Sequence, residues 1–239
     1  LDGGAGADSM AGGLGADTYQ VDTAGDVVDE TGGDGVDSVF STVTFTLGAG
    51  VENLTLQAGA VNGFASNAAA DDNVITGNNA TNILVGYAGN DTLIGGDGND
   101  TLNGGDDAES IEGGSGADQL NGGIGADTMR GGVASDIYIV DDIGDVVDET
   151  GGNGAADEVR SGITYTLGTG LERLTLVGLN AINGTGNSVD NVLVGNIAAN
   201  NLNGGGGNDR LAGGEGDDTL NGSAGDDTMI GASGNERYF

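Results

Sequence analysis

Residues 86–103 read GYAGNDTLIGGDGNDTLN, which is two nine-residue phrases placed back to back. Each phrase begins with glycine, carries aspartate at its sixth position and leucine at its eighth. Side chains alternate between the two faces of a β-strand, so the leucine points inward while its two neighbours face solvent. A chain that repeats this unit at a fixed short period is typical of a solenoid, in which each copy stacks on the next.

The same phrase recurs at 3–20, 68–139 and 186–239, which gives sixteen copies. Position eight is apolar or aromatic in every copy, and position six always carries a side-chain oxygen. Position six is aspartate in ten copies: Asp8, Asp17, Asp91, Asp100, Asp118, Asp127, Asp136, Asp209, Asp218 and Asp227. The other six copies have Asn73, Asn82, Glu109, Asn191, Asn200 and Glu236.

The composition is strongly acidic, with 38 Asp and Glu against 5 Lys and Arg and a formal charge of −33. Such a chain, with 52 glycines and 4% aromatic residues, would be disordered on composition alone, but the constant phase of the repeat argues against disorder. The charge excludes nucleic acid and anionic lipid as partners. There is no apolar run of about 18 residues, which excludes a membrane-spanning helix. Because the chain has no His and no Cys, it cannot form a Ser-His-Asp triad or a zinc site, and we expect no enzyme activity.

A longer period lies over the short one. GDVVDETGG occurs identically at 25–33 and 144–152, so the chain is about two copies of a super-repeat of roughly 119 residues. The segments between the regular phrases keep part of the pattern. Asp37 lies at position six of GGDGVDSVF, and Asp157 follows one extra residue in GGNGAADEV.

The phrase predicts an all-β fold. Glycines at positions one, two and four predict a tight loop over the first six residues, and positions seven to nine predict a short strand. Two phrases make one coil of eighteen residues, so the fold expected is a right-handed parallel β-roll with variant β-rich blocks at 21–66 and 140–184. The segments expected along the chain are the end of a repeat run at 1–20, a variant block at 21–66, a roll at 67–139, a variant block at 140–185 (with residue 185 joining it to the next roll) and a roll at 186–239. These segments form either separate units or one continuous solenoid.

Phrases such as GGAGADSMA, GGLGADTYQ, GGDGNDTLN and GGIGADTMR resemble the GGxGxDxUx nonapeptide of the RTX (hemolysin-type calcium-binding) family. The resemblance implies a β-roll in which several Ca²⁺ ions lie between the loops of adjacent turns, held by position-six carboxylates and loop carbonyls. Carried to this chain, it implies calcium ligands at the ten position-six aspartates, with Asp37, Asp157 and Glu109 as further candidates. Asp100 with Asp118 is expected to form a stronger site than Asp91 with Glu109.

Electrostatics points to the same ion. Strands in a sheet lie about 4.8 Å apart, and two unit charges at that distance repel by roughly 3 kcal/mol at an effective dielectric of about 20. A cation must neutralise such columns, and a donor set made only of oxygens suits Ca²⁺. The turns at 68–85 and 186–203, which have Asn at position six, are expected to bind calcium weakly or not at all, with their amides stacked in a ladder.

The function expected is a non-catalytic calcium-binding β-roll that folds on extracellular Ca²⁺, as a structural or adhesive repeat segment of a secreted or cell-surface bacterial protein. The resemblance also implies type I secretion, and surface-layer or adhesin proteins are candidate parents. The alternative is the C-terminal folding and secretion module of an RTX lipase, protease, epimerase or pore-forming toxin. The chain begins and ends within the repeat, so we also expect end-to-end self-association or assembly into a larger surface structure.

Overall fold

The computed structural model describes residues 1–66, 71–150 and 156–239, and within these ranges all regular secondary structure is β-strand. Every strand pairing is parallel. The all-β architecture predicted from the phrase is therefore confirmed. The first residues of two predicted phrases, 68–70 in the first and 151–155 in the second, lie outside the described residues.

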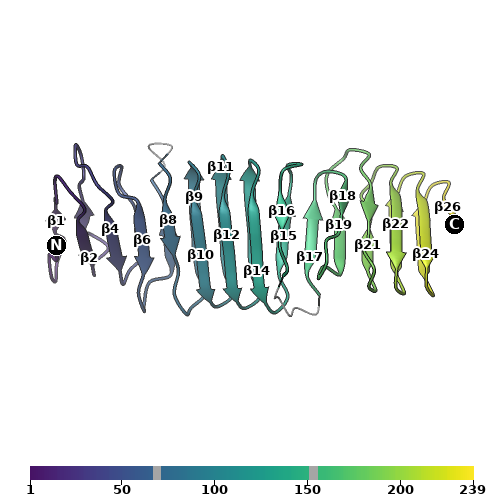
Figure 1. Cartoon of the computed structure of the whole chain (residues 1–239), viewed down its shortest axis with the longest axis horizontal. Helices are drawn as coiled ribbons and strands as arrows, with labels where there is room; N and C mark the ends of the chain where they lie inside the picture. The colour runs from purple at the N-terminus through teal and green to yellow at the C-terminus, as the bar shows by residue number, and fades with distance from the viewer. Residues whose placement is uncertain (67–70, 151–155) are drawn as a thin grey trace.

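The strands form two broad faces along one axis, and the N-terminus and the C-terminus lie at opposite ends of it (Figure 1). One face begins with an eight-stranded sheet of β2 (Thr18–Val21), β4 (Ser38–Ser41), β6 (Asn53–Leu56), β8 (Val74–Thr76), β10 (Thr92–Asp97), β12 (Ser110–Ser115), β14 (Thr128–Val133) and β16 (Val146–Val147). It continues as a five-stranded sheet of β18 (Tyr165–Thr166), β20 (Gly184–Thr185), β22 (Asn201–Gly206), β24 (Thr219–Ala224) and β26 (Arg237–Tyr238).

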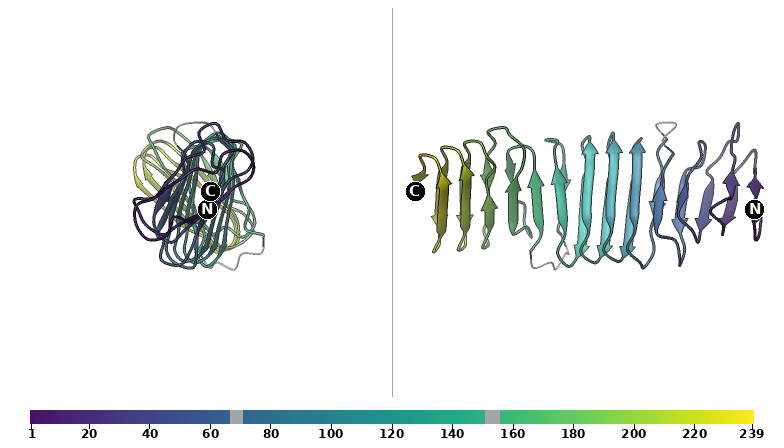
Figure 2. Two further views of the ribbon diagram at one scale, coloured as in Figure 1. Left: turned by 90° about the vertical axis from the view of Figure 1, so that its left-hand side faces the viewer. Right: turned by 180° about the vertical axis from the view of Figure 1, so that it is seen from behind.

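The other face holds an eleven-stranded sheet and the short pair β1 (Ser9–Met10) and β3 (Val27–Val28). The large sheet contains β5 (Phe45–Thr46), β7 (Asn62–Phe64), β9 (Ile83–Ala88), β11 (Thr101–Asp106), β13 (Gln119–Ile124), β15 (Ile137–Val140), β17 (Glu158–Ser161), β19 (Arg173–Leu176), β21 (Val192–Val194), β23 (Arg210–Glu215) and β25 (Thr228–Ser233). Successive strands therefore alternate between the two faces, and the coils lie over one another along the long axis (Figure 2).

The register of the sheets equals the predicted coil of eighteen residues. Leu93 pairs with Ile75 on one side and with Ile111 on the other, each eighteen residues away. On the opposite face Leu102 pairs with Leu84 and Leu120 in the same way. The chain is thus a β-solenoid in which nine-residue phrases occupy alternate faces.

The strands of the regular phrases are longer than predicted. β10 covers six residues, because it includes Gly95, Gly96 and Asp97 of the following phrase in addition to positions seven to nine. Gly96 pairs with Gly114 in the next coil, so the first two glycines belong to the ladder and the loop is limited to positions four to six. The prediction of a six-residue loop was wrong because glycines without side chains still take part in backbone pairing.

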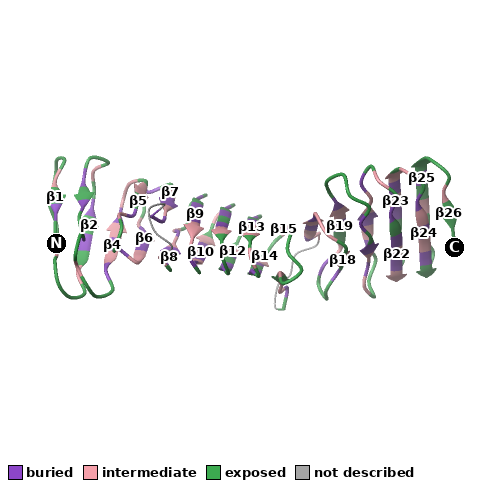
Figure 3. Cartoon of the chain, turned by 90° about the horizontal axis from the view of Figure 1, so that it is seen from above, coloured by how far each residue is buried: buried purple, intermediate pink, exposed green. Residues whose placement is uncertain are grey.

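The core is a single thin layer between the two faces. Burial alternates along the strands, as Figure 3 shows for β22 and β24. Position eight is buried from Met10 to Leu220, and Tyr19 and Tyr138 are its largest side chains. In the last two phrases Met229 is half-buried and Tyr238 is 53% exposed, since no further coil covers them.

The ladder also passes through the variant blocks. β2, β4, β6 and β8 pair in order, although the register steps are 20, 15 and 21 residues instead of eighteen. The eleven-stranded sheet likewise includes strands from both variant blocks and both rolls. The longer and shorter coils therefore change the loops and leave the stacking of the strands intact.

Positions two and four have a left-handed backbone in the phrases with an acidic residue at position six, but not in the asparagine phrases at 77–85 and 186–203. Within the described ranges, five residues other than glycine have positive φ, and all five fall at these two positions: Tyr87, Asp107, Ala134, Ser223 and Ala232. L-residues adopt this conformation at a cost, which explains why glycine dominates there.

Candidate metal centres

The position-six carboxylates are buried, and the loops place them inside the edges of the solenoid. Nine of the aspartates proposed as ligands are no more than 2% exposed: Asp37, Asp91, Asp100, Asp118, Asp127, Asp136, Asp157, Asp209 and Asp218. Glu109 is 4% exposed, while Asp8, Asp17 and Asp227 are half-buried near the ends of the chain. A buried charge needs a partner, so these residues do not form an ordinary solvated acidic face.

Hydrogen bonds between successive coils orient most of these carboxylates. The backbone N–H of Asp100 donates to Oδ1 of Asp118 at 2.7 Å, and the N–H of Asp118 donates to Oδ1 of Asp136 at 2.8 Å. The N–H of Asp136 continues the column to Oδ1 of Asp157 at 2.8 Å. The structure therefore brings the predicted pair Asp100 and Asp118 together in one continuous column.

The step from Asp91 to Glu109 lacks this hydrogen bond. Neither carboxylate oxygen of Glu109 has a hydrogen-bond partner, so Glu109 does not receive the Asp91 N–H. The Glu109 N–H itself donates to Oδ1 of Asp127 at 2.9 Å. The longer glutamate thus interrupts the ladder of bonds at this step, and the weaker calcium site predicted for it stays a prediction.

In eight of the column aspartates the second carboxylate oxygen is buried and has no hydrogen-bond partner. This holds for the buried Oδ2 atoms of Asp8, Asp91, Asp100, Asp118, Asp127, Asp136, Asp209 and Asp218. An unpaired buried carboxylate oxygen costs roughly 1–3 kcal/mol or more. Such regular orphaned oxygens indicate positions prepared for a ligand.

The first glycine of each phrase makes room for this oxygen. A Cβ added at Gly95 would lie 2.4 Å from Oδ2 of Asp100 and 2.5 Å from the carbonyl oxygen of Gly113. At Gly113 the same test meets Oδ2 of Asp118 at 2.4 Å and the carbonyl oxygen of Gly131 at 2.7 Å. A carboxylate oxygen and a strand carbonyl oxygen from the next coil therefore converge on one small space.

The donor set fits a hard divalent cation. It consists of carboxylate and carbonyl oxygens, which Ca²⁺ binds in flexible geometry with six to eight ligands. Mg²⁺ demands a stricter octahedron and retains its waters. The buried, unpartnered oxygens fit calcium as the ion these loops would hold.

Burial without a counter-charge raises the pKa of several column carboxylates. Desolvation raises the pKa of Asp91, Asp118 and Asp136 to about 6, against the lowering effect of the backbone hydrogen bonds that they accept. Desolvation, followed by the neighbouring Asp127 carboxylate, also raises the pKa of Glu109. A bound cation would favour the charged forms and reverse these shifts.

Four further carboxylates, which were not predicted as ligands from the sequence, join the columns. Asp8 N–H donates to Oδ1 of Asp26 at 3.1 Å, and Asp37 N–H donates to Oε2 of Glu52 at 2.7 Å. The second super-repeat has the equivalent bonds from Asp127 to Asp145 and from Asp157 to Glu172. Each acceptor lies two residues before a residue in the position-eight register, and this spacing could have identified it.

The asparagine turns use a different solution. Asn82 Nδ2 donates to the carbonyl of Val61 at 2.7 Å, and Asn200 Nδ2 donates to the carbonyl of Ile182 at 2.6 Å. Asn73 and Asn191 likewise donate to loop carbonyls of the preceding coil. The predicted ladder of stacked amides is wrong, since each amide binds backbone. In these turns the side-chain amide N–H₂ donates to backbone carbonyl oxygens, whereas in the acidic phrases backbone carbonyl oxygens lie beside a carboxylate.

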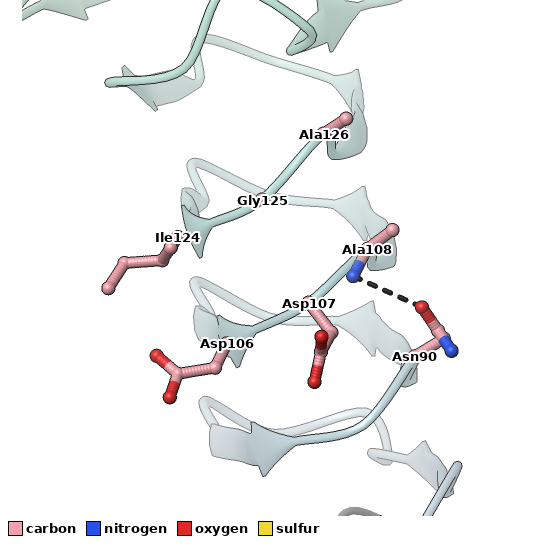
Figure 4. Close-up of a pocket in the computed structure, with 7 residues that line it drawn as sticks. All are labelled: Asn90, Asp106, Asp107, Ala108, Ile124, Gly125 and Ala126. Carbon is pink, nitrogen blue, oxygen red and sulfur yellow. Dashed lines mark hydrogen bonds between the residues drawn. The ribbon is translucent and has the colours of Figure 1, made fainter.

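A second, outer row of side chains lies at position five. Asn90, Ala108 and Ala126 stack on successive loops, and Ala108 N–H donates to Oδ1 of Asn90 at 3.2 Å (Figure 4). Together with Asp106 and Asp107 they line a shallow surface groove. The groove is lined by carboxylate, amide and apolar groups of three successive loops.

A family model described as RTX calcium-binding nonapeptide repeat (4 copies) matches residues 1–19, 76–108, 103–138, 185–220 and 203–236, which is more than half of the chain. Comparison with curated proteins found no match. The described residues include no helix long and apolar enough to cross a membrane.

Proposed function

The chain belongs to the RTX calcium-binding nonapeptide-repeat family, and from this premise we propose that it is a non-catalytic solenoid segment that folds when it binds calcium. The ligands we propose are the position-six carboxylates predicted from the sequence, together with Asp26, Glu52, Asp145 and Glu172. Each ion would lie between the loops of successive coils, with carbonyl oxygens completing its shell.

The observation that carries this proposal is the regular row of buried carboxylate oxygens without hydrogen-bond partners. The folded chain concentrates a formal charge of −33 along a narrow solenoid. Without cations, repulsion of roughly 3 kcal/mol per adjacent pair at an effective dielectric of about 20 would exceed what a thin core supplies. Calcium would remove this repulsion and satisfy the orphaned oxygens, so binding and folding become one process.

Coupled folding suits a secreted or cell-surface bacterial protein. Extracellular calcium modules work at dissociation constants of about 10⁻⁴–10⁻³ M, so the chain would stay unfolded in a low-calcium cytosol and condense outside. We favour a structural or adhesive role over an accessory secretion module of an enzyme or toxin, because the eleven-stranded sheet on one face includes strands from both super-repeats.

We also propose calcium-dependent end-to-end association. β25 and β26 each pair on one side only, and an unpaired strand edge is a template for another chain. Light scattering of the calcium-bound chain should show a mass that rises with concentration, and a strict monomer would contradict this part of the proposal.

Far-ultraviolet circular dichroism tests the folding switch. The chain should give a coil spectrum in chelator and a β spectrum in millimolar calcium, whereas equal magnesium should leave it mostly unfolded. A β spectrum in chelator that calcium does not change would overturn the proposed function.

A further inference from the structure

Two groups of three carboxylates depart from the pattern of one acidic residue per phrase. Asp17, Glu30 and Asp37 form the first group, in which one carboxylate oxygen from each residue lies within 4.8 Å of the other two. Asp136, Glu149 and Asp157 form the second group with the same closeness. We call these groups the three-carboxylate centres. They occupy equivalent places in the two super-repeats, since Asp136 and Glu149 follow Asp17 and Glu30 by 119 residues.

The added member of each centre takes a position that is normally glycine. Val28 pairs with Met10 and so lies in the position-eight register, which places Glu30 at position one of the next phrase. The loop that follows is longer than usual, because Val39, the next residue in register, comes eleven residues after Val28 instead of nine. This extra length makes room for a side chain where a Cβ would otherwise collide, and Glu149 repeats the arrangement.

Buried atoms without partners point into the first centre. Glu30 is 4% exposed, and neither of its carboxylate oxygens has a hydrogen-bond partner. The hydroxyl of Tyr19 is also buried and unpartnered. A Cβ added at Gly12 would lie 2.3 Å from Oδ2 of Asp17 and 2.4 Å from this hydroxyl, so Tyr19 is aimed at the same space as the carboxylates.

Backbone oxygen is available there as well. A Cβ added at Gly33 would lie 2.4 Å from Oε2 of Glu30 and 2.7 Å from the carbonyl oxygen of Gly13. The first centre thus brings three carboxylates, a tyrosine hydroxyl and a loop carbonyl to one enclosed place.

The second centre has the equivalent three carboxylates and tyrosine hydroxyl, with two hydrogen bonds added. The hydroxyl of Tyr138 donates to Oε1 of Glu149 and accepts from the N–H of Gly131 at 2.6 Å. Oδ2 of Asp136 remains buried and unpartnered. Because the arrangement occurs twice in segments far apart in the sequence, it is a built feature of the super-repeat.

We infer that each three-carboxylate centre binds one hard cation more tightly than the sites formed by two position-six residues. The affinity of oxygen-ligand calcium sites is tuned by the number of charged ligands, and a third buried carboxylate adds one full negative charge at short range. The two centres would therefore fill first when calcium is scarce. Each lies where the coil departs from eighteen residues, so the ion would hold together turns of unequal length. This inference rests on the proposed calcium binding and assigns its strongest sites.

Terbium provides the test, because Tb³⁺ replaces Ca²⁺ and emits when a nearby tyrosine is excited. The full chain has five tyrosines and no tryptophan, so sensitised emission reports ions close to tyrosine. Titration of the calcium-free chain with Tb³⁺ alone should give tyrosine-sensitised emission at the lowest concentrations, and calcium should displace it. The double variant Tyr19→Phe/Tyr138→Phe should lose most of this emission while it binds the same number of ions by equilibrium dialysis.

The charge of the added glutamates is tested with an isosteric change. The double variant Glu30→Gln/Glu149→Gln should raise the terbium concentration at half-saturation by at least about tenfold, equivalent to about 1.4 kcal/mol per site. Glu112→Gln makes the same change at an exposed residue and should have no effect. A wild-type midpoint in the glutamate double variant, or undiminished emission in the tyrosine double variant, would overturn the inference.

The calcium-dependent dichroism separates the two proposals. If the glutamate double variant titrates with terbium like the wild type but still folds on calcium, only the three-carboxylate centres are refuted. If the wild-type chain shows no calcium-dependent folding, the proposed function itself fails, whatever the terbium emission shows.

Discussion

The backbone N–H of Asp100 donates to Oδ1 of Asp118 at 2.7 Å, while Oδ2 of Asp118 is buried without a partner. One oxygen of the carboxylate is held by the neighbouring coil and the other is left free. Within the folded solenoid the neighbouring coil therefore fixes the orientation of the Asp118 carboxylate, and a cation that binds the free oxygen meets a ligand already aimed at it.

Acidification should stabilise the metal-free solenoid. The folded pKa of Asp91, Asp118 and Asp136 is about 6, above the unfolded value of about 3.9, so folding is penalised as pH rises through this range. In calcium-free buffer, β content measured by circular dichroism should increase as pH falls from about 7 toward 4. With calcium the trend reverses, since protons compete with the ion and the calcium midpoint should rise below about pH 6. Loss of metal-free β content on acidification would contradict the raised pKa values.

A side chain at the first glycine of a phrase should disrupt its site. In Gly95→Ala the new Cβ would meet Oδ2 of Asp100 at 2.4 Å and a carbonyl oxygen at 2.5 Å, so one of them must move. We expect a loss of about 1–3 kcal/mol in urea denaturation at saturating calcium. Gly162→Ala is the control, because its Cβ would have no neighbour closer than 4.0 Å. Equal denaturation midpoints for the two variants would be inconsistent with the crowding inferred at position one.

Glycine should be the better residue at position four of the phrase that contains Ala134. Ala134 has φ of 83°, in the left-handed region. Ala134→Gly should stabilise the calcium-bound chain by about 1 kcal/mol. Ala117→Gly lies at position five, outside the positive-φ set, and should instead destabilise by about 0.4–1 kcal/mol. Thermal unfolding in calcium distinguishes them, and a destabilising Ala134→Gly would refute the strain at this residue.

An aspartate in place of Asn82 should make its turn dependent on calcium. The Asn82 amide donates to the carbonyl of Val61, and a carboxylate would lose this bond and face the carbonyl oxygen. Asn82→Asp should lose about 1–3 kcal/mol in low calcium and recover part of it as calcium rises. Asn79→Asp, at an exposed residue, adds the same charge without this contact. If both variants respond to calcium alike, the Asn82 amide does not act as a substitute for the ion.

The repeat itself predicted most of the fold. The apolar residue at position eight identified the core from Met10 to Leu220, because stacking of identical phrases leaves only one inward direction for it. Strand length was underestimated, since glycines at positions one and two carry no β propensity yet pair through their backbone. The register steps of 20, 15 and 21 residues place Asp26 and Glu52 outside the strict nine-residue period, although each lies two residues before a residue in the position-eight register.

The repeat pattern predicted which residues are candidate ligands, but it did not predict how deeply they are buried or how they are hydrogen-bonded. Position six was expected to lie in columns, whereas its burial and the division between a held and a free oxygen come from hydrogen bonds across coils. Glu30 and Glu149 were overlooked because both occupy a position that is otherwise glycine, and only the strand register places them beside the columns.

The most direct test is the number of calcium ions bound by Asp118→Asn compared with Asp97→Asn. Asparagine at 118 keeps an Oδ1 acceptor for the Asp100 N–H but removes the charge, while Asp97 is exposed at position three. Equilibrium dialysis at saturating calcium should show at least one ion fewer for Asp118→Asn and the wild-type number for Asp97→Asn. An unchanged count in Asp118→Asn would contradict the claim that the buried carboxylate columns hold calcium.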